Sequence, residues 1–176
     1  NRPDAIETVP LDQAINRILA QDLVSPIDVP AADNSAMDGF AFNGECLKGC
    51  QAEIKLRIVG TALAGKPYKG KIAGGECLKI MTGAVMPSDC DTVIPQEFTT
   101  SADAEYISFK ANQLKAGENR RMRGEDLQKD KPAIKAGRLL RPSDLGLAAS
   151  LGINTLKVKC KLKVAILSSG NELRSL

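Results

Sequence analysis

The sequence predicts an α+β, β-rich protein in which a first domain is built from two separated segments and a second, β-rich domain is inserted between them. Short β-prone runs, separated by clusters of Gly, Pro, Asp and Ser, occupy residues 45–126. Segments with the apolar spacing of short helices flank this region on both sides. We therefore expect residues 1–34 and 127–160 to form the first domain, and residues 35–126 to form the inserted one.

The N-terminal segment is predicted to begin with a short helix. Apolar side chains recur at i, i+4, i+7 and i+8 across residues 11–19, which places them on one helical stripe. Pro26 and Pro30 then enclose an extended link, because proline does not continue a helix. Two turn signals follow within residues 33–39, which favours a loop before the β-rich domain.

Strands are predicted through the middle of the chain. Apolar side chains alternate with charged ones from residue 54, the pattern of a half-buried strand over residues 54–59. Short β-prone runs bounded by turn residues predict three more strands, over residues 77–81, 92–95 and 106–109.

The segment after the β-rich domain is predicted to hold three elements. Residues 132–141 suit an extended hairpin that turns at Ala136 and Gly137. A helix with an acidic first turn is expected to begin near Pro142 and to end at Gly152. A strand over residues 155–159 follows.

The C-terminal segment predicts the start of a third domain. Residues 164–167 are a fully apolar run that leads into Ser-Ser-Gly, typical of a buried parallel strand before a ligand-binding loop. A parallel strand needs a crossover of about a dozen residues or more, and the chain stops at Leu176. We therefore expect residues 161–176 to be the first strand of an α/β domain whose remainder is missing.

The composition excludes several kinds of active site. The chain contains no His, which excludes Ser-His-Asp and Cys-His nucleophiles and His-based zinc sites. Aromatic residues make up only 3%, so stacking platforms for single-stranded nucleic acid are not expected. Catalysis would have to use carboxylates, Lys, Arg, hydroxyls, backbone amides or a metal held by oxygen.

The five cysteines indicate a reducing compartment. Their number is odd and their spacing is wide, unlike the disulfide framework of a small secreted domain. Cys46 and Cys50 are the one close pair, and without further Cys or His ligands they do not complete a zinc site. No apolar run approaches the roughly 18 residues of a membrane span. We expect a cytoplasmic protein that has no membrane partner.

The charges are unevenly distributed along the chain. Residues 1–109 carry 9 Lys and Arg against 15 Asp and Glu, whereas residues 110–141 carry 10 against 4. A basic segment beside an acidic body favours an anionic small molecule or a partner surface over nucleic acid. The alternative is an ordinary solvated, charged face.

One sequence resembles a phosphate-binding P-loop. Residues 60–66 follow a predicted strand and match the motif except at its last position, where Pro67 offers no hydroxyl for Mg²⁺. We therefore interpret this stretch as a strand followed by a turn.

Three short motifs could carry chemistry. Asp33 and Asp38 lie on a turn-rich segment and could bind Mg²⁺, although Asp33 suits the cap of a turn better. Thr82 is followed by Gly at the end of a predicted strand, where a hydroxyl and backbone N–H groups could meet an oxyanion. Residues 119–126 combine three Arg with two carboxylates, which suits a tetrahedral oxyanion and its divalent ion, or else internal ion pairing.

Five motifs in order resemble one family. They are DNSAMDGF, IMTGA, NRRMRGED, KAGRLLRPSDLGLAASLGI and VAILSSGNEL. Together they resemble the N-terminal part of the molybdopterin molybdenumtransferases, the molybdenum cofactor insertases related to the gephyrin E domain. The resemblance spans residues 10–173, which is less than half of a typical member. The residues of the first motif, Asn-Ser-Ala-Met before Asp-Gly, resemble those of bacterial members.

The resemblance implies a fold and a reaction. Such enzymes are elongated homodimers that bind molybdate and adenylylated molybdopterin, use Mg²⁺, insert molybdenum into the dithiolene and release AMP. Molybdopterin adenylyltransferase is the implied protein partner. The active site is a cleft between the β-rich second domain of one subunit and the molybdopterin-binding third domain of the other.

Motif matching also assigns roles to residues. Asp38, Asp126 and Glu172 would be catalytic, with Asp38 and Asp126 also binding the metal. Thr82 and Arg121 would be cofactor-binding. Glu172 would belong to the third-domain side of the cleft, and the other four would line the β-rich side.

The chain departs from the family pattern at three points. Met122 stands where bacterial members often have a third consecutive Arg, and Asn171 replaces the commoner Asp. The larger departure is the missing remainder of the third domain and the C-terminal barrel. We therefore expect no turnover by this chain alone. The alternative function is a non-catalytic dimerisation or scaffold module that binds a partner protein.

Overall fold

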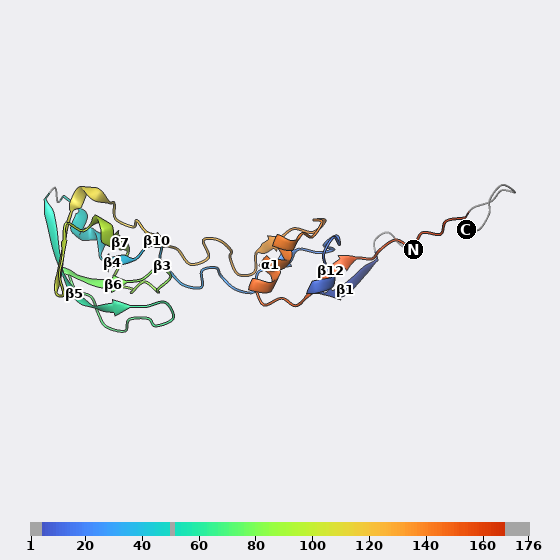
Figure 1. The fold of residues 1–176 in the computed structure, drawn as a ribbon, viewed down its shortest axis with the longest axis horizontal. Helices are drawn as coiled ribbons and strands as arrows, with labels where there is room; N and C mark the ends of the chain where they lie inside the picture. The colour runs from blue at the N-terminus through green and yellow to red at the C-terminus, as the bar shows by residue number, and fades with distance from the viewer. Residues whose placement is uncertain (1–4, 50–51, 168–176) are drawn as a thin grey trace, which may run out of the picture. The chain divides into compact units, whose positions relative to one another are not determined.

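The computed structural model describes residues 5–49 and 52–167. These divide into two compact units (Figure 1). The first combines the N-terminal residues up to Pro26 with the residues from Asp130 onward, and the second runs from Ile27 to Lys129. The boundaries therefore lie at 26/27 and 129/130, whereas the sequence analysis placed them at 34/35 and 126/127.

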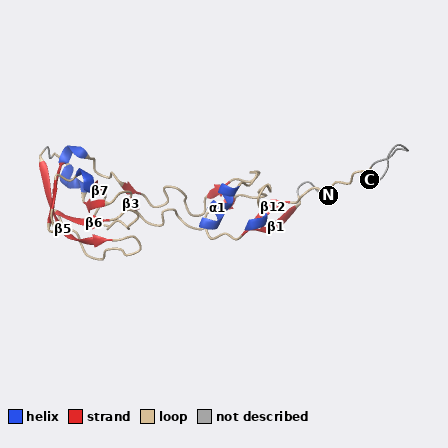
Figure 2. Cartoon of the chain, in the orientation of Figure 1, coloured by secondary structure: helices blue, strands red, loops and turns tan. Residues whose placement is uncertain are grey.

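The second unit is built on a six-stranded sheet, in agreement with the β-rich prediction (Figure 2). Its strand order is β7-β4-β6-β5-β9-β8, and only the β5–β6 pair is parallel. The strands are β4 (Gly39–Phe42), β5 (Glu53–Ala62), β6 (Glu76–Ile80), β7 (Thr92–Pro95), β8 (Ser101–Ala102) and β9 (Tyr106–Lys110). Single-turn 3-10 helices follow three of these strands: η2 (Gly44–Leu47) after β4, η3 (Gln96–Phe98) after β7 and η4 (Ala111–Gln113) after β9.

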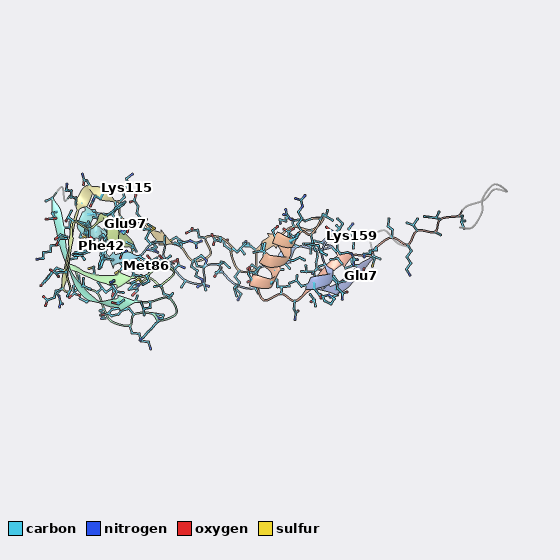
Figure 3. All side chains as sticks on the ribbon, viewed as in Figure 1. Glu7, Phe42, Met86, Glu97, Lys115 and Lys159 are labelled. Carbon is cyan, nitrogen blue, oxygen red and sulfur yellow. The ribbon has the colours of Figure 1, made fainter. Side chains whose placement is uncertain are left out.

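Both faces of the sheet are buried at β4 and β7, whereas the side chains of β5 and β9 alternate between buried and more exposed positions. Successive side chains of a strand point to opposite faces, and accordingly the neighbouring residues Ala41 and Phe42 of β4 belong to two different buried clusters. Met86, between β6 and β7, belongs to the cluster of Ala41 and not to that of Phe42 (Figure 3). Phe42 packs against Phe109 with ring centroids 5.3 Å apart, and both rings are fully buried. The four predicted strands of this unit are confirmed to within a few residues. The alternation in residues 54–59 corresponds to the one buried face of that part of β5.

A small strand pair lies beside the sheet. Strand β3 (Asn34–Ser35) pairs antiparallel with β10 (Arg120–Arg121). On its other side, Asn34 forms a bridge with Val85, just beyond β6. This short strand therefore has hydrogen-bonded neighbours on both edges.

The first unit joins the two ends of the described chain. Strand β1 (Ile6–Pro10) pairs antiparallel with β12 (Thr155–Lys159), and β2 (Leu23–Val24) pairs with β11 (Pro132–Ile134). One α-helix, α1 (Pro142–Ser150), packs over these strands through a core that includes Leu19, Leu140 and Ala148.

Helix α1 begins and ends where the sequence analysis placed it. Asp144 accepts a hydrogen bond from the backbone N–H of Arg141 at 2.9 Å and one from Nε of Arg138 at 2.8 Å. These bonds satisfy an N-terminal backbone donor and neutralise a carboxylate whose side chain is only 8% exposed. Gly152 adopts a positive φ of 75° just after the helix, a conformation that glycine accepts readily.

The helix predicted over residues 11–19 is wrong. Only Leu11–Gln13 is helical, as the 3-10 turn η1. Asn16 takes a left-handed φ of 58°, and Ile18 forms a bridge with Leu139. The backbone of Ile18 and Leu19 pairs with the distant residues 138 and 139, which local spacing does not reveal, and Ile15 is exposed.

The hairpin predicted over residues 132–141 is also wrong in its pairing. The turn is present, and Gly137 has a φ of 85°. Its two arms pair with the N-terminal segment instead of each other: Ile134 pairs with Leu23, and the N–H of Leu19 donates to the carbonyl of Arg138.

The strand predicted over residues 164–167 is absent. The residues are extended without ladder pairing, and Val164, Ile166 and Leu167 are 78%, 88% and 94% exposed. An apolar run forms a strand only against a partner edge, and none of the strands in the described part of the chain pairs with it.

Candidate functional site

Asp38 and Thr82 are brought into direct contact by the sheet of the second unit. Asp38 precedes β4 and Thr82 follows β6, and these antiparallel neighbours pair Gly39 with Ile80. The two residues therefore meet at one edge of the sheet. The Oδ1 atom of Asp38 accepts one hydrogen bond from the backbone N–H of Thr82 and one from its hydroxyl, both at 2.7 Å.

Glycine at position 39 is required for this arrangement. A Cβ atom there would lie 2.0 Å from the carbonyl oxygen of Ile94, on the neighbouring strand β7. Gly39 pairs with Pro95 on that strand, and the N–H of Gln96 donates to the carbonyl of Asp38 at 3.1 Å. Close packing of backbone against backbone thus fixes the residue beside Asp38.

The two donors of Thr82 also set the charge of Asp38. They lower the pKa of its carboxyl group, the backbone N–H having the larger effect and the hydroxyl the smaller one. Asp38 is exposed and is an anion at neutral pH. Its Oδ2 atom accepts no hydrogen bond from the described residues.

Arg121 and Asp126 form the second contact among the predicted residues. The Arg121 guanidinium donates to Oδ2 of Asp126 at 2.6 Å and lies 3.4 Å from Oε1 of Glu125. Glu125 also accepts from the backbone N–H of Met122 at 2.9 Å. The pKa of Arg121 is raised, chiefly by the bond to Asp126.

Each of the three arginines of this segment is paired with an internal carboxylate. Arg120 contacts Asp33 at 2.5 Å and Arg123 contacts Asp28 at 2.6 Å, in addition to the pairing of Arg121. Of the two alternatives for residues 119–126, internal ion pairing is the one that the structure contains. An oxyanion would have to share Arg121 with its carboxylates.

Strand β3 connects the two contacts. The N–H of Gly83 donates to the carbonyl of Ser35 at 2.8 Å, and Ser35 pairs with Arg120 on its other side. Adjacent strands lie about 4.8 Å apart, so the backbones after Thr82 and before Arg121 are separated by about 10 Å. No hydrogen bond or ion pair between described residues joins Asp38 or Thr82 to Arg121 or Asp126.

The fit of these residues to Mg²⁺ rests on their donor atoms. Mg²⁺ is commonly held by one or two carboxylates together with water and substrate phosphate. Asp38 and Asp126 are exposed, and each has one carboxylate oxygen that accepts no hydrogen bond from the described residues. The residues that the structure describes contain no group of three or more His, Cys, Asp or Glu side chains that could hold a metal without a further ligand. A substrate phosphate or oxyanion would therefore have to complete the site.

Three other residues singled out in the sequence have different outcomes. Glu172 lies outside the described residues, as does Cys50. Asp33, interpreted as the cap of a turn, forms an ion pair with Arg120, 87 residues away in the sequence. Spacing gives no signal for such a pair, so the sequence analysis missed Arg120 as its partner.

The P-loop-like stretch is a strand and a turn, as interpreted. Gly60 belongs to β5, and Leu63 and Lys66 form an isolated bridge across the turn. No helix follows it within the described residues up to β6.

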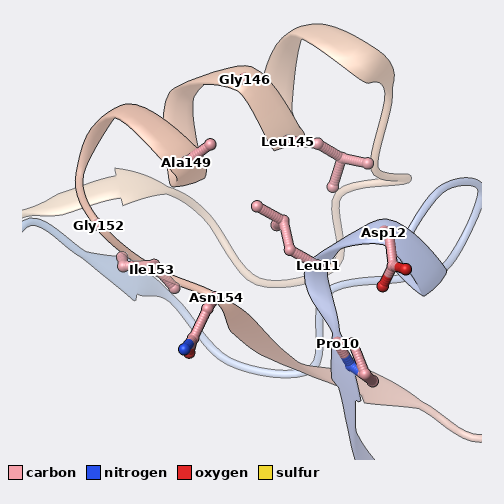
Figure 4. Close-up of a pocket in the computed structure, with 9 residues that line it drawn as sticks. All are labelled: Pro10, Leu11, Asp12, Leu145, Gly146, Ala149, Gly152, Ile153 and Asn154. Carbon is pink, nitrogen blue, oxygen red and sulfur yellow. The ribbon is translucent and has the colours of Figure 1, made fainter.

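The first unit contains an apolar pocket of about 730 Å³ between η1 and α1 (Figure 4). Its lining includes Leu11, Leu145 and Ile153, and Asp12 is its one acidic residue. None of the predicted site residues lines it.

Comparison with known proteins identifies the family. A family model described as the MoeA N-terminal region, domains I and II, matches residues 2–152. The chain belongs to this family. No helix in the described residues is long and apolar enough to cross a membrane.

Two curated relatives of this MoeA-family chain carry the same name. A protein of Haemophilus influenzae named molybdopterin molybdenumtransferase is 40% identical over 171 residues, which are 97% of this chain and 41% of that protein. A protein of Synechococcus elongatus with the same name is 37% identical over 97% of this chain and 42% of its own length. The chain thus spans about two fifths of the relatives it matches.

A solved structure shares the fold. The molybdopterin biosynthesis moeA protein of Pyrococcus horikoshii superposes with a TM-score of 0.81 at 31% identity. The match covers 90% of this chain and 42% of that structure.

Proposed function

We propose that this chain is the N-terminal part of a molybdopterin molybdenumtransferase. The whole protein would insert molybdenum from molybdate into adenylylated molybdopterin, with Mg²⁺, and release AMP. The observation that carries the proposal is the contact between Asp38 and Thr82. Two motifs that resemble the family separately are joined by two hydrogen bonds across 44 residues of sequence.

The described residues have distinct roles in this proposal. Thr82 fixes one oxygen of Asp38, leaving Oδ2 for a cation. Asp126 would supply the second carboxylate oxygen, and Arg121 would share its guanidinium with the oxyanion. Mg²⁺, when bound, neutralises the negative charge of the phosphate and the oxyanion. Arg121, already paired, then needs only to reorient its donors.

The rest of the machinery lies outside the described residues. Glu172, in the third domain of a partner subunit, would complete the cleft of a homodimer. We expect this chain to give a mass of about twice 18.7 kDa by light scattering at micromolar concentration, and to lack turnover by itself. Molybdopterin adenylyltransferase would hand over the substrate in the cytoplasm.

Calorimetric titration of the chain with molybdate or AMP tests the proposal. Heat that depends on Mg²⁺ is expected from the exposed pair of Asp38 and Asp126, and it should vanish in Asp38→Asn. The alternative, a dimerisation or scaffold module, predicts a dimer with no Mg²⁺-dependent heat from either ligand, and that result would contradict the insertase assignment.

A further inference from the structure

The side chain of Asp33 holds the residues on both sides of Arg121. Its Oδ2 atom accepts from the Arg120 guanidinium at 2.5 Å, and its Oδ1 atom accepts from the backbone N–H of Arg123 at 2.7 Å. One carboxylate therefore anchors the segment immediately before and two residues after Arg121. The pair with Arg120 is partly buried, with side chains 30% and 24% exposed.

The backbone of Asp33 reaches toward the other half of the site. Its carbonyl accepts from the N–H of Met86 at 2.9 Å, and β3 continues this pairing through Ser35 and Gly83. Asp33 thus contacts the chain that follows Thr82 through its backbone, and the chain around Arg121 through its side chain.

We propose that Asp33 is a positioning residue: its side chain holds the turn that follows Arg121 and carries Asp126 in register with β3, and so with the segment that carries Thr82. This inference rests on the proposed function. In that function Asp33 contacts neither the substrate nor the metal. Its effect on the oxyanion would pass through Arg121, whose flanking residues it fixes.

The turn has a second, independent anchor that makes this proposal testable. The N–H of Asp126 donates to the carbonyl of Val29 at 2.9 Å, and the N–H of Gly124 donates to that of Pro30 at 3.0 Å. Removing the Asp33 carboxylate should therefore free the half of the turn near Arg123, while the half near Asp126 stays attached.

Hydrogen exchange on this chain measures the first effect. In Asp33→Ala, the amide of Arg123 should exchange faster, and the amide of Asp126 should keep its protection. Asp33→Asn retains an oxygen that can accept from Arg123, so protection at that amide should be largely restored.

Insertion kinetics of the whole protein that carries this chain measure the second effect. Partners that orient a binding group typically change affinity or activity by about 10- to 100-fold when removed. Asp33→Ala should raise the KM for molybdate by about tenfold while changing kcat less. The double variant Asp33→Asn with Arg120→Gln also removes the Arg120 charge that would be left without its partner, and it should lower the KM part of the way back to the wild-type value.

Glu76 provides a matched control. Its carboxylate accepts from the backbone N–H of Ala73 at 2.9 Å and pairs with the Arg57 guanidinium, the same pattern away from the candidate residues. Glu76→Ala should cost stability without changing the KM for molybdate.

The outcomes separate the two proposals. If Asp33→Ala frees the Arg123 amide yet leaves the KM unchanged, or if Glu76→Ala raises the KM equally, the positioning role is overturned and the proposed function stands. A wild-type whole protein without insertion activity overturns the proposed function, and the role of Asp33 falls with it.

Discussion

Thr82 donates twice to the same oxygen of Asp38, once from its backbone and once from its hydroxyl, both at 2.7 Å. The first bond depends on the chain path and survives any substitution of the side chain. The second depends on the hydroxyl alone. The pair therefore separates what the fold contributes to the orientation of Asp38 from what the Thr82 side chain contributes.

Thr82→Val tests that separation. The variant keeps the shape of the side chain and the backbone N–H bond but loses the hydroxyl donor. Insertion by the whole protein should fall about 10- to 100-fold, because a group that orients the proposed metal-binding carboxylate is lost. Thr82→Ser retains the hydroxyl and should stay close to wild type in the same steady-state assay. Equal activity of the Val and Ser variants would show that the backbone bond suffices.

Under the proposed function, Asp38→Ala and Asp126→Ala should each abolish molybdenum insertion by the whole protein and leave the proposed dimer intact. Both carboxylates are exposed, so their removal opens no cavity in a core. Activity assays and light scattering on the same preparations check the two halves of this expectation. Near-normal insertion by either variant would remove that residue from the site.

Gly39→Ala should destabilise the second unit by about 1–3 kcal/mol, the usual range for an overpacked position. The new Cβ would sit 2.0 Å from the carbonyl oxygen of Ile94 and push β4 from β7. Gly74→Ala is the control, since a Cβ there meets no atom within 4 Å, and it should change the free energy of unfolding by less than about 0.5 kcal/mol. Urea titration of both variants measures these changes, and equal unfolding midpoints for Gly39→Ala and Gly74→Ala would refute the clash.

The fold could be predicted where the evidence is local. The alternation in residues 54–59 and the proline and acidic residue at the start of α1 gave the strand β5 and the helix at nearly their observed limits. The helix predicted from the stripe over residues 11–19 is wrong because only Leu19 of its four apolar residues is buried, Ile15 is exposed, and Ile18 forms a bridge with the distant Leu139. Apolar spacing does not show whether a segment pairs with its own turn or with a distant strand.

The candidate site could be predicted only residue by residue. Motif resemblance pointed to Asp38 and Thr82 but not to the hydrogen bonds between them, which depend on β4 and β6 being neighbours. The Asp-Gly step was interpreted as a turn signal, whereas Gly39 is required by close approach of Ile94. Asp33 was assigned to a turn because its partner Arg120 lies far away in the sequence.

Asp144→Asn should destabilise the first unit by about 1–3 kcal/mol at pH 7, the range for a hydrogen-bonded charged group that loses its charge. The bond from Arg138, followed by that from the N–H of Arg141, lowers the pKa of Asp144 in the folded chain. A lowered folded pKa means that the stabilisation is complete above the unfolded value of about 3.9 and is lost as the pH falls through the folded pKa. The difference in urea midpoint between wild type and Asp144→Asn should therefore shrink between pH 7 and about pH 2.5.

Asp12→Asn, at an exposed position of the same unit, serves as the control, and its urea midpoint at pH 7 should stay close to that of the wild type. A difference for Asp144→Asn that stays constant or grows on acidification would contradict the assignment of its stabilising effect to the ionised carboxylate.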